Sequence, residues 1–269
     1  MYLTIFILLI AFFANDSYAL KKNHVYQAVK ERAIEKGVSE EYLKQVFEDE
    51  NIQIHREISE RFSKPYEKKS WADYRKLFVK PSRIDKGSEF YTERQETLIK
   101  VSKHYGVDPY LILSIVGIES NYGSHYKQFK VFNSLYTQIL EMPKRANWAT
   151  TELIEFLFYC YEDSIPPHSV YGSYAGAFGF GQFIPSSFNH YAVDFDGDGI
   201  RQAYEWPDVM ASIANYLIKN GYPANNYSNK DKLYKAVYSY NHSDNYVRAV
   251  LELRDELQKA IDSKINEEN

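Results

Sequence analysis

Cysteine is nearly absent from this 269-residue chain, and so is any excess of basic charge. The single cysteine, Cys160, excludes an internal disulfide, and its place in the apolar run Ile154–Tyr161 is typical of a small core residue. Lys and Arg number 32 against 36 Asp and Glu, which gives a net charge of −4. This balance gives no reason to expect a nucleic acid as a partner.

Long apolar runs, period-2 alternation and internal repeats are also scarce. The run Leu3–Ala14 is too short to span a membrane comfortably, and a small-x-small cleavage pattern follows it and ends at Ala19. We therefore expect a signal peptide over residues 1–19, with an uncleaved anchor as the alternative because no Lys or Arg precedes the run. Elsewhere helical periodicity dominates, so the sequence predicts an all-α (mainly α) fold.

Cap residues and apolar spacing predict where the helices begin and end. Ser39 is placed as an N-cap, Ser186 is a plausible N-cap, and Pro81 is expected to close a connection that starts at Trp71. A capped helix–helix turn would place Ser243 as the N-cap of the final helix. The main expected helices are Tyr91–Tyr105, Asn133–Met142, Thr150–Tyr161, Pro207–Asn220, Lys230–Tyr240 and Asp244–Ile261.

The stretch Asp108–Gly123 predicts a buried helix with one ionisable side chain at its end. Asp108 suits the N-cap, Pro109 suits the first helical position, and the following residues are apolar on nearly all sides. Glu119 comes just before the chain turns. Apolar neighbours and the negative end of the helix dipole should both raise its pKa, which suits a general acid. The alternative is a solvated Glu at a frayed helix end.

Asp194–Glu205 matches the EF-hand loop rule D-x-[DN]-x-[DN]-G-x₅-E at every defined position. Carboxylates at positions 1, 3, 5 and 12, with a backbone carbonyl at position 7, form the ligand set that calcium prefers. The alternative is an acidic surface turn. The predicted ligands are Asp194, Asp196, Asp198, Ile200 and Glu205, and a single loop of this kind suggests a structural clip rather than a sensor.

Two further segments combine small, polar and aromatic residues. Gly172–Ser187 is rich in glycine and rings, and Ser173 and Gln182 offer neutral groups suited to sugar hydroxyl and acetamido groups. Tight packing is the alternative for this loop. Tyr240–Tyr246 is a polar, aromatic hinge between helices, in which His242 is more simply a turn residue than a metal ligand.

Taken together, these motifs resemble the membrane-bound lytic transglycosylase B family, whose members act on bacterial peptidoglycan. The motifs are GIESNYG around Glu119, SYAGAFGFGQFIPSS, YAVDFDGDG, ANYL and YNHSDNYVRAVL, and they run in family order between Val38 and Leu253. The resemblance implies a lysozyme-like catalytic core with additional N-terminal helices and an EF-hand-like calcium loop. It also implies a bacterial envelope location.

Carried over by position, Glu119 is expected to be the sole catalytic acid/base. The expected substrate-binding residues are Ser173, Gln182, Tyr240, Asn241 and Tyr246, with Tyr74, Arg145 and Tyr216 as further ones. Pro143-Lys144-Arg145 stands where the family has Pro-Arg-Arg, so one basic contact is altered. Some members insert a β-domain after the ANYL helix, but the gap Tyr222–Tyr240 is too short for one, and we expect none here.

The resemblance implies cleavage of the β-1,4 bond between N-acetylmuramic acid and N-acetylglucosamine, with a 1,6-anhydromuramyl product. The expected division is a signal peptide (1–19), an N-terminal helical region (20–104) and the catalytic core (105–269). We expect a periplasmic monomer that binds glycan strands, with structural Ca²⁺ and no organic cofactor. A hydrolytic muramidase, which needs a second carboxylate, and a non-catalytic glycan- or calcium-binding envelope protein are the alternatives.

Overall fold

The computed structural model describes residues 23–63 and 68–268, so the expected signal peptide lies outside the described residues. Within this part of the chain, helices form nearly all of the regular structure, and each of the two strands has two residues. The expectation of an all-α fold is therefore confirmed. Among the described residues, none of the helices combines the length and the hydropathy that a membrane crossing requires.

The N-terminal part consists of short helices followed by one long helix. A helix over residues 23–35 comes first, and then α2 (Glu40–Glu48), α3 (Glu57–Ser63), α4 (Trp71–Phe78) and α5 (Pro81–Tyr105). Ser39 caps α2 as expected, since its Oγ accepts the N–H of Tyr42 at 3.2 Å. The connection expected from Trp71 ends at Pro81 as predicted but begins later, because residues 71–78 form α4. Pro81 begins α5, because its fixed φ and missing N–H are tolerated in a first helical turn.

The remaining elements begin with α6 (Pro109–Ser120), which follows α5 after a short turn. They continue with β1 (Phe129–Lys130), α7 (Val131–Glu141), α8 (Ala146–Glu162), the 3₁₀ turn η2 (Pro167–Ser169), β2 (Tyr171–Gly172), α9 (Pro185–Tyr191), α10 (Trp206–Lys219), α11 (Lys230–Tyr240) and α12 (Asp244–Glu268). The strands pair antiparallel, with Phe129 opposite Gly172. Each helix expected from the sequence is present; Lys230–Tyr240 has the expected bounds, and the others are shifted at one or both ends.

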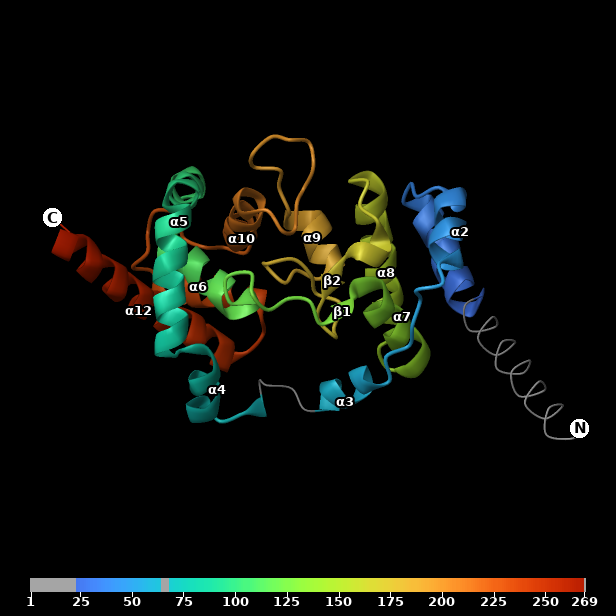
Figure 1. The fold of residues 1–269 in the computed structure, drawn as a ribbon, viewed down its shortest axis with the longest axis horizontal. Coiled ribbons are helices and arrows are strands. Elements are labelled where there is room, and N and C mark those ends of the chain that lie inside the picture. The colour runs from blue at the N-terminus through green and yellow to red at the C-terminus, as the bar shows by residue number, and fades with distance from the viewer. Residues whose placement is uncertain (1–22, 64–67, 269) are drawn as a thin grey trace, which may run out of the picture.

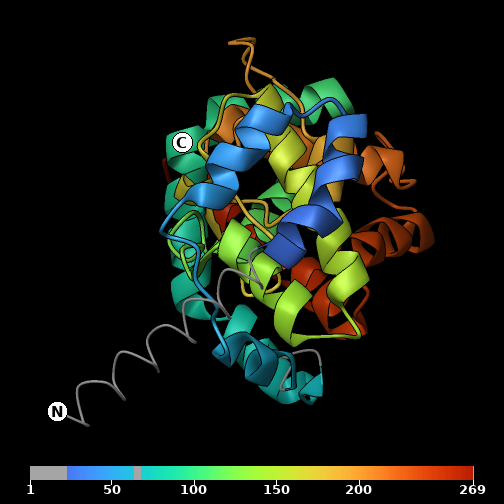
Figure 2. The ribbon, with the colours of Figure 1, turned by 90° about the vertical axis from the view of Figure 1, so that its right-hand side faces the viewer.

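The helices form two groups, which lie on the two sides of Figure 1 and meet where α9 packs on α10. In one group α5 packs against α6, α10 and α12, and α12 also packs on α6. In the other group α7 packs on α8, and α8 packs on α9. Figure 2 shows the N-terminal helices covering the α7–α8 pair, and the Phe47 ring of α2 lies 5.3 Å from the Phe132 ring of α7.

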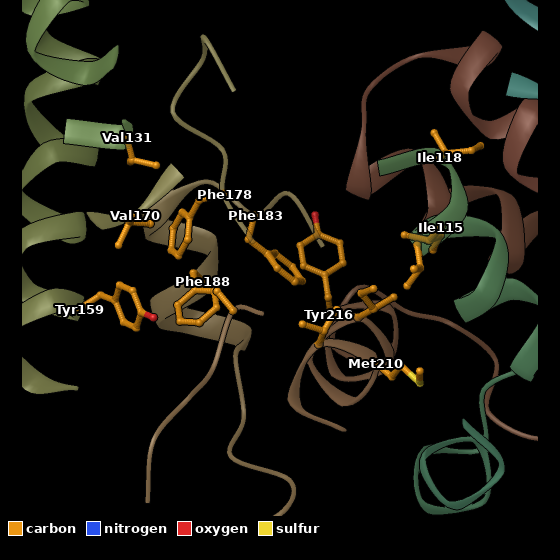
Figure 3. Packing of buried hydrophobic residues seen from close by; sticks show 14 of the residues in the cluster. Ile115, Ile118, Val131, Tyr159, Val170, Phe178, Phe183, Phe188, Met210 and Tyr216 are labelled. Carbon is orange, nitrogen blue, oxygen red and sulfur yellow. The ribbon is translucent and has the colours of Figure 1, made fainter. Parts of the chain in front are cut away.

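The glycine-rich segment lies between the two groups and is held there by aromatic packing. In Figure 3, Phe178 and Phe188 lie beside Tyr159 of α8, and Phe183 lies between them and Tyr216 of α10. The ring centroids of Phe183 and Tyr216 are 5.9 Å apart, and those of Phe178 and Phe188 are 4.9 Å apart. Burial of these rings anchors a loop that has little regular structure of its own.

Residues 222–240 contain a turn and α11, and no β-domain occurs in the described ranges. That expectation is confirmed. Ser243 caps α12, since its Oγ accepts the N–H of Tyr246 at 3.4 Å. The expected cap at Ser186 was wrong. Helix α9 begins at Pro185, and the amide and hydroxyl of Ser186 both donate to the Glu152 carboxylate, at 2.9 and 2.8 Å.

Candidate active site

Helix α6 is built as its sequence predicts, with its apolar residues buried on every side. Asp108 accepts the N–H of Tyr110 at 2.9 Å, and Pro109 occupies the first turn. Residues 111–118 are all buried. Glu119, at the C-terminal end, is partly buried, and the chain then turns at Asn121 in the left-handed region. A rigid, buried helix thus presents one carboxyl group at its end.

A hydroxyl group of α12 meets this carboxyl group. Tyr246 donates its O–H to Oε1 of Glu119 at 2.6 Å, and its ring is 2% exposed. Burial raises the pKa of Tyr246 well above its ordinary value, and the charge of Glu119 raises it further. The Tyr246 hydroxyl therefore stays protonated and remains a donor to Glu119.

The three other expected tyrosines lie on the side of Tyr246, and Tyr240 contacts it directly. Tyr240 stacks on Tyr246, with ring centroids 6.4 Å apart and planes at 4°, and it donates to the Gly181 carbonyl at 2.6 Å. Tyr216 packs on Tyr240 at 4.9 Å, and burial raises the pKa of Tyr216 to about 12. Tyr74 of α4 is buried and lies close enough to Tyr246 to raise its pKa.

Ser173 and Gln182 make hydrogen bonds within the glycine-rich loop. Tyr240 connects this loop to the Tyr246–Glu119 pair. The Oγ of Ser173 accepts the N–H of Ala175 at 3.3 Å and of Ala177 at 3.2 Å. Gln182 adopts a φ of 50°, and its amide donates to the Gly179 carbonyl at 2.8 Å. Both side chains are partly exposed, so each can also face a ligand. The route from this loop to Glu119 runs through Gly181, Tyr240 and Tyr246.

Arg145 lies in the other helix group, at the start of α8. Its guanidinium is sandwiched between the rings of Phe62, at 4.4 Å, and Trp148, at 4.2 Å. Its Nε donates to Oε1 of Gln138 at 3.0 Å, and burial lowers the pKa of Arg145. Asn241 is partly buried at the turn between α11 and α12, and its carbonyl accepts the N–H of Ser243 at 2.7 Å.

Sequence reasoning missed Gln138, a fully buried side chain on α7. Its amide donates to the Tyr174 carbonyl at 3.2 Å, while its Oε1 accepts from Arg145. Gln138 therefore connects the glycine-rich loop to the start of α8. The available signal was a polar residue at a core position of an apolar helix, because such groups are almost always hydrogen-bonded.

The acidic loop gathers three carboxylates, but only two of them belong to the EF-hand set. Oxygens of Asp194, Asp196 and Asp208 lie within 4.8 Å of one another. Asp208, three residues beyond the motif, is 1% exposed and accepts the N–H groups of Phe195 and Gln202, both at 2.8 Å. Burial raises the pKa of Asp208, and the charge of Asp196 raises it further. Sequence reasoning missed Asp208 because the motif ends before it.

The other predicted metal ligands are placed differently. Asp198 accepts the N–H of Ile200 at 2.8 Å and the side-chain amide of Gln202 at 2.6 Å. Glu205 is exposed and stands at the N-cap position of α10. The loop itself projects from the molecule between α9 and α10 (Figure 1). Three oxygen donors at mutual ligand distance suit a hard cation such as Ca²⁺.

A family model described as Transglycosylase SLT domain matches residues 21–232 of this chain. The chain belongs to this family. It is 35% identical over 153 residues to Membrane-bound lytic murein transglycosylase B of Escherichia coli (strain K12). That alignment covers 57% of this chain and 42% of the relative, so the chain matches less than half of that protein.

Solved structures extend the similarity over most of the SLT-domain chain. Soluble lytic transglycosylase SltB1 from Pseudomonas aeruginosa matches with a TM-score of 0.79 and 28% identity, covering 88% of this chain and 99% of that one. SltB3 from the same organism, in complex with NAG-NAM-pentapeptide, gives 0.79 and 25%, covering 88% and 79%. Slt35 of Escherichia coli, in complex with calcium, gives 0.79 and 23%, covering 88% and 93%, which shows the fold alone. These matches confirm the expected lysozyme-like lytic transglycosylase fold.

Proposed function

We propose that this SLT-domain chain is a peptidoglycan lytic transglycosylase. It cleaves the β-1,4 bond between N-acetylmuramic acid and N-acetylglucosamine and forms a 1,6-anhydromuramyl end. The observation that carries the proposal is the partly buried Glu119 carboxyl, positioned by a buried tyrosine hydroxyl at the end of an apolar helix. The lytic transglycosylases among its relatives support the same reaction.

One carboxyl group suffices for this reaction, whereas ordinary glycosidases use two. Glu119 donates its proton to the bridging oxygen as the bond from that oxygen to muramyl C1 breaks. The muramyl C6 hydroxyl then attacks C1, and its proton passes to the Glu119 carboxylate. The C1–O6 bond replaces the glycosidic bond and no water is consumed. Tyr246 stabilises the carboxylate between the two steps, because its hydroxyl stays protonated.

The raised pKa that the sequence predicts for Glu119 stays a prediction, and so do the substrate contacts. Tyr240 and Tyr246 offer a stacked pair of rings next to the acid, and amphipathic rings suit sugar faces. SltB3 has been solved with NAG-NAM-pentapeptide, which supports glycan strands as the partner. The proposed substrate-binding residues are Tyr74, Arg145, Ser173, Gln182, Tyr216, Tyr240, Asn241 and Tyr246.

We also propose that the acidic loop binds Ca²⁺ as a structural clip. Asp194, Asp196 and Asp208 would hold it, since their oxygens already lie at mutual ligand distance. Asp198, Ile200 and Glu205 remain the other ligands that the EF-hand rule predicts. A bound cation would offset the repulsion among these carboxylates and fasten the loop to the first turn of α10, where Asp208 lies.

Export to the periplasm, a monomeric state and the division at residues 104 and 105 remain predictions of the same kind. Helix α5 lies before that division and yet packs on α6, α10 and α12. A truncation that removes residues 20–104 would therefore expose apolar faces of all three helices. A sharper test of a separate N-terminal region would begin the chain at α5.

The decisive experiment is a digest of purified peptidoglycan by the chain without residues 1–19, with the product masses recorded. Anhydromuropeptides, one water lighter than hydrolytic products, are the expected result, and Glu119→Gln should release none. Products of hydrolytic mass would instead support a muramidase. Glycan binding without any product would support the non-catalytic alternative.

A further inference from the structure

The backbone directly after Glu119 has an unusual conformation. Asn121, Tyr122 and Gly123 have φ values of 48°, 56° and 76°, so three consecutive residues lie in the left-handed region. Residues other than glycine adopt this region rarely, and tyrosine is among the bulky ones. Such a turn persists only when its surroundings fix it. Two sets of contacts do so here.

The first is a notch that receives the Tyr122 ring. A Cβ atom at Gly117 of α6 would lie 2.6 Å from the Tyr122 hydroxyl, and one at Gly87 of α5 would lie 2.3 Å from it. Neither distance is tolerable, so both helices need glycine where the ring passes. Tyr122 is 6% exposed and also packs on Phe90 at 5.4 Å. The notch holds the ring by shape, since the hydroxyl finds no hydrogen-bond partner among the residues that the structure describes.

The second is Arg83, a guanidinium that is 9% exposed. Its Nε donates to Oδ1 of Asn121 at 3.2 Å. Its Nη1 donates to the carbonyls of Leu77 at 3.1 Å and Phe78 at 3.0 Å. These carbonyls end α4, where a cation is favoured by the helix dipole. A planar, multiply donating group is needed to reach both partners at once.

Arg83 thus connects the C-terminal ends of α4 and α6 by hydrogen bonds. Helix α6 carries Glu119, two residues before Asn121, and α4 packs on α12, which carries Tyr246. We propose that Arg83 is a positioning residue for Glu119. By fixing the left-handed Asn121 against the end of α4, it holds the carboxyl where the Tyr246 hydroxyl meets it.

The inference rests on the proposed function, and two variants test it. Arg83→Lys keeps the positive charge but loses the planar guanidinium with its several donors. Asn121→Gly allows the same left-handed backbone but loses the side-chain amide. Each should lower kcat about 10- to 100-fold, because small displacements of a catalytic group are costly. KM for glycan strands should change little. The double variant should be no worse than either single one, since both break the same link.

Arg254→Lys is the matched control, at the opposite end of α6. Arg254 pairs with Asp108, the N-cap of the helix, at 2.6 Å. Arg254→Lys should lower Tm by about as much as Arg83→Lys does but leave kcat unchanged. The proposal is overturned if folded Arg83→Lys or Asn121→Gly keeps wild-type kcat, or if kcat falls equally in the control. Should Arg83→Lys fail to fold, Asn121→Gly decides. A wild-type chain that forms no anhydro product refutes the proposed function instead.

Discussion

Glu119 and the acidic loop place carboxyl groups in opposite surroundings, one alone on an apolar helix and the others close together. Glu119 is the one acid of an apolar helix, and the partner of its Oε1 is a tyrosine hydroxyl. In the loop, oxygens of Asp194, Asp196 and Asp208 lie within 4.8 Å of one another. A carboxyl among rings can give and retake a proton, whereas crowded carboxylates need a cation. Under the proposed function, the same functional group would serve two purposes through its neighbours.

The hydrogen-bond donors also differ between the two sites. Asp194 accepts the N–H groups of Gly197, Asp198 and Gly199, at distances between 2.7 and 3.2 Å. These hydrogen bonds tie the Asp194 carboxylate to the backbone of its own loop. The Tyr246 hydroxyl on Glu119 is a side-chain group, and it can adjust as the carboxyl changes protonation. The comparison predicts that each site fails in its own way when it is altered.

The largest expected effect is the loss of turnover in Glu119→Gln. Removing the proposed general acid should lower kcat by about 10³-fold or more, because the proposed mechanism assigns both proton transfers to this one carboxyl group. Tm should stay within a few degrees, since Glu119 is only partly buried. The control, Asp194→Asn, should keep turnover when calcium is absent from both samples. Release of anhydromuropeptides, measured by mass spectrometry, checks both, and more than about a tenth of wild-type activity in Glu119→Gln contradicts the assignment.

Tyr246→Phe should lower kcat by about 10- to 100-fold. A hydrogen bond to a charged group contributes about 1.5–3 kcal/mol, and in the proposed mechanism the Tyr246 hydroxyl would stabilise the Glu119 carboxylate between the two steps. Losing the donor also disfavours ionised Glu119, so the limb of the pH–rate profile that reports this group should move to higher pH.

Tyr204→Phe is the control for that variant. Its hydroxyl donates to the Tyr171 carbonyl at 2.7 Å, and its loss should leave both kcat and the pH profile unchanged. An unshifted profile in Tyr246→Phe would mean that the hydroxyl does not act on the acid.

Calcium should stabilise the folded chain, and the calcium-dependent rise in Tm should depend most on Asp208. An ion at about 100 times its Kd raises the free energy of unfolding by about 2.7 kcal/mol, which a chelator removes. We expect Asp208→Asn to abolish the calcium-dependent rise in Tm, because Asp208 lies within 4.8 Å of its partners. Glu205→Gln, at the exposed N-cap, should keep most of it. The reverse ranking would favour the EF-hand rule over the group seen in the structure.

Sequence reasoning found the helices because caps and periodicity are local. Asp108, Ser39 and Ser243 cap the helices that follow them, and the apolar surface of α6 showed that it is buried. The error before Pro81 concerns where the connection begins, because residues 71–78 form α4. Pro81 ends the connection as predicted and also begins α5, which packs on α6, α10 and α12.

The site was predicted less completely, because its contacts join elements far apart in the chain. The Tyr246–Glu119 hydrogen bond spans 127 positions, and the Arg83–Asn121 contact spans 38. The family resemblance placed Tyr246 in the cleft, but nothing local indicated which group its hydroxyl meets. Asp208 was missed for the same reason, since a fixed-length motif cannot include a carboxylate from the following helix.

The smallest effect concerns Glu152, a buried carboxyl that belongs to neither site. Burial raises the pKa of Glu152, so the folded chain keeps a proton that the unfolded chain has lost. Its contribution to stability is therefore complete below its ordinary pKa and is lost as pH rises through the higher folded pKa. Glu152→Gln should not show this loss. The free energy of unfolding of the variant, relative to that of the wild type, should therefore rise by about 1 kcal/mol between about pH 4 and pH 7. Urea unfolding across that range measures the difference. A constant offset would mean that Ser186, which donates twice to this carboxyl, holds it as an anion and outweighs its burial.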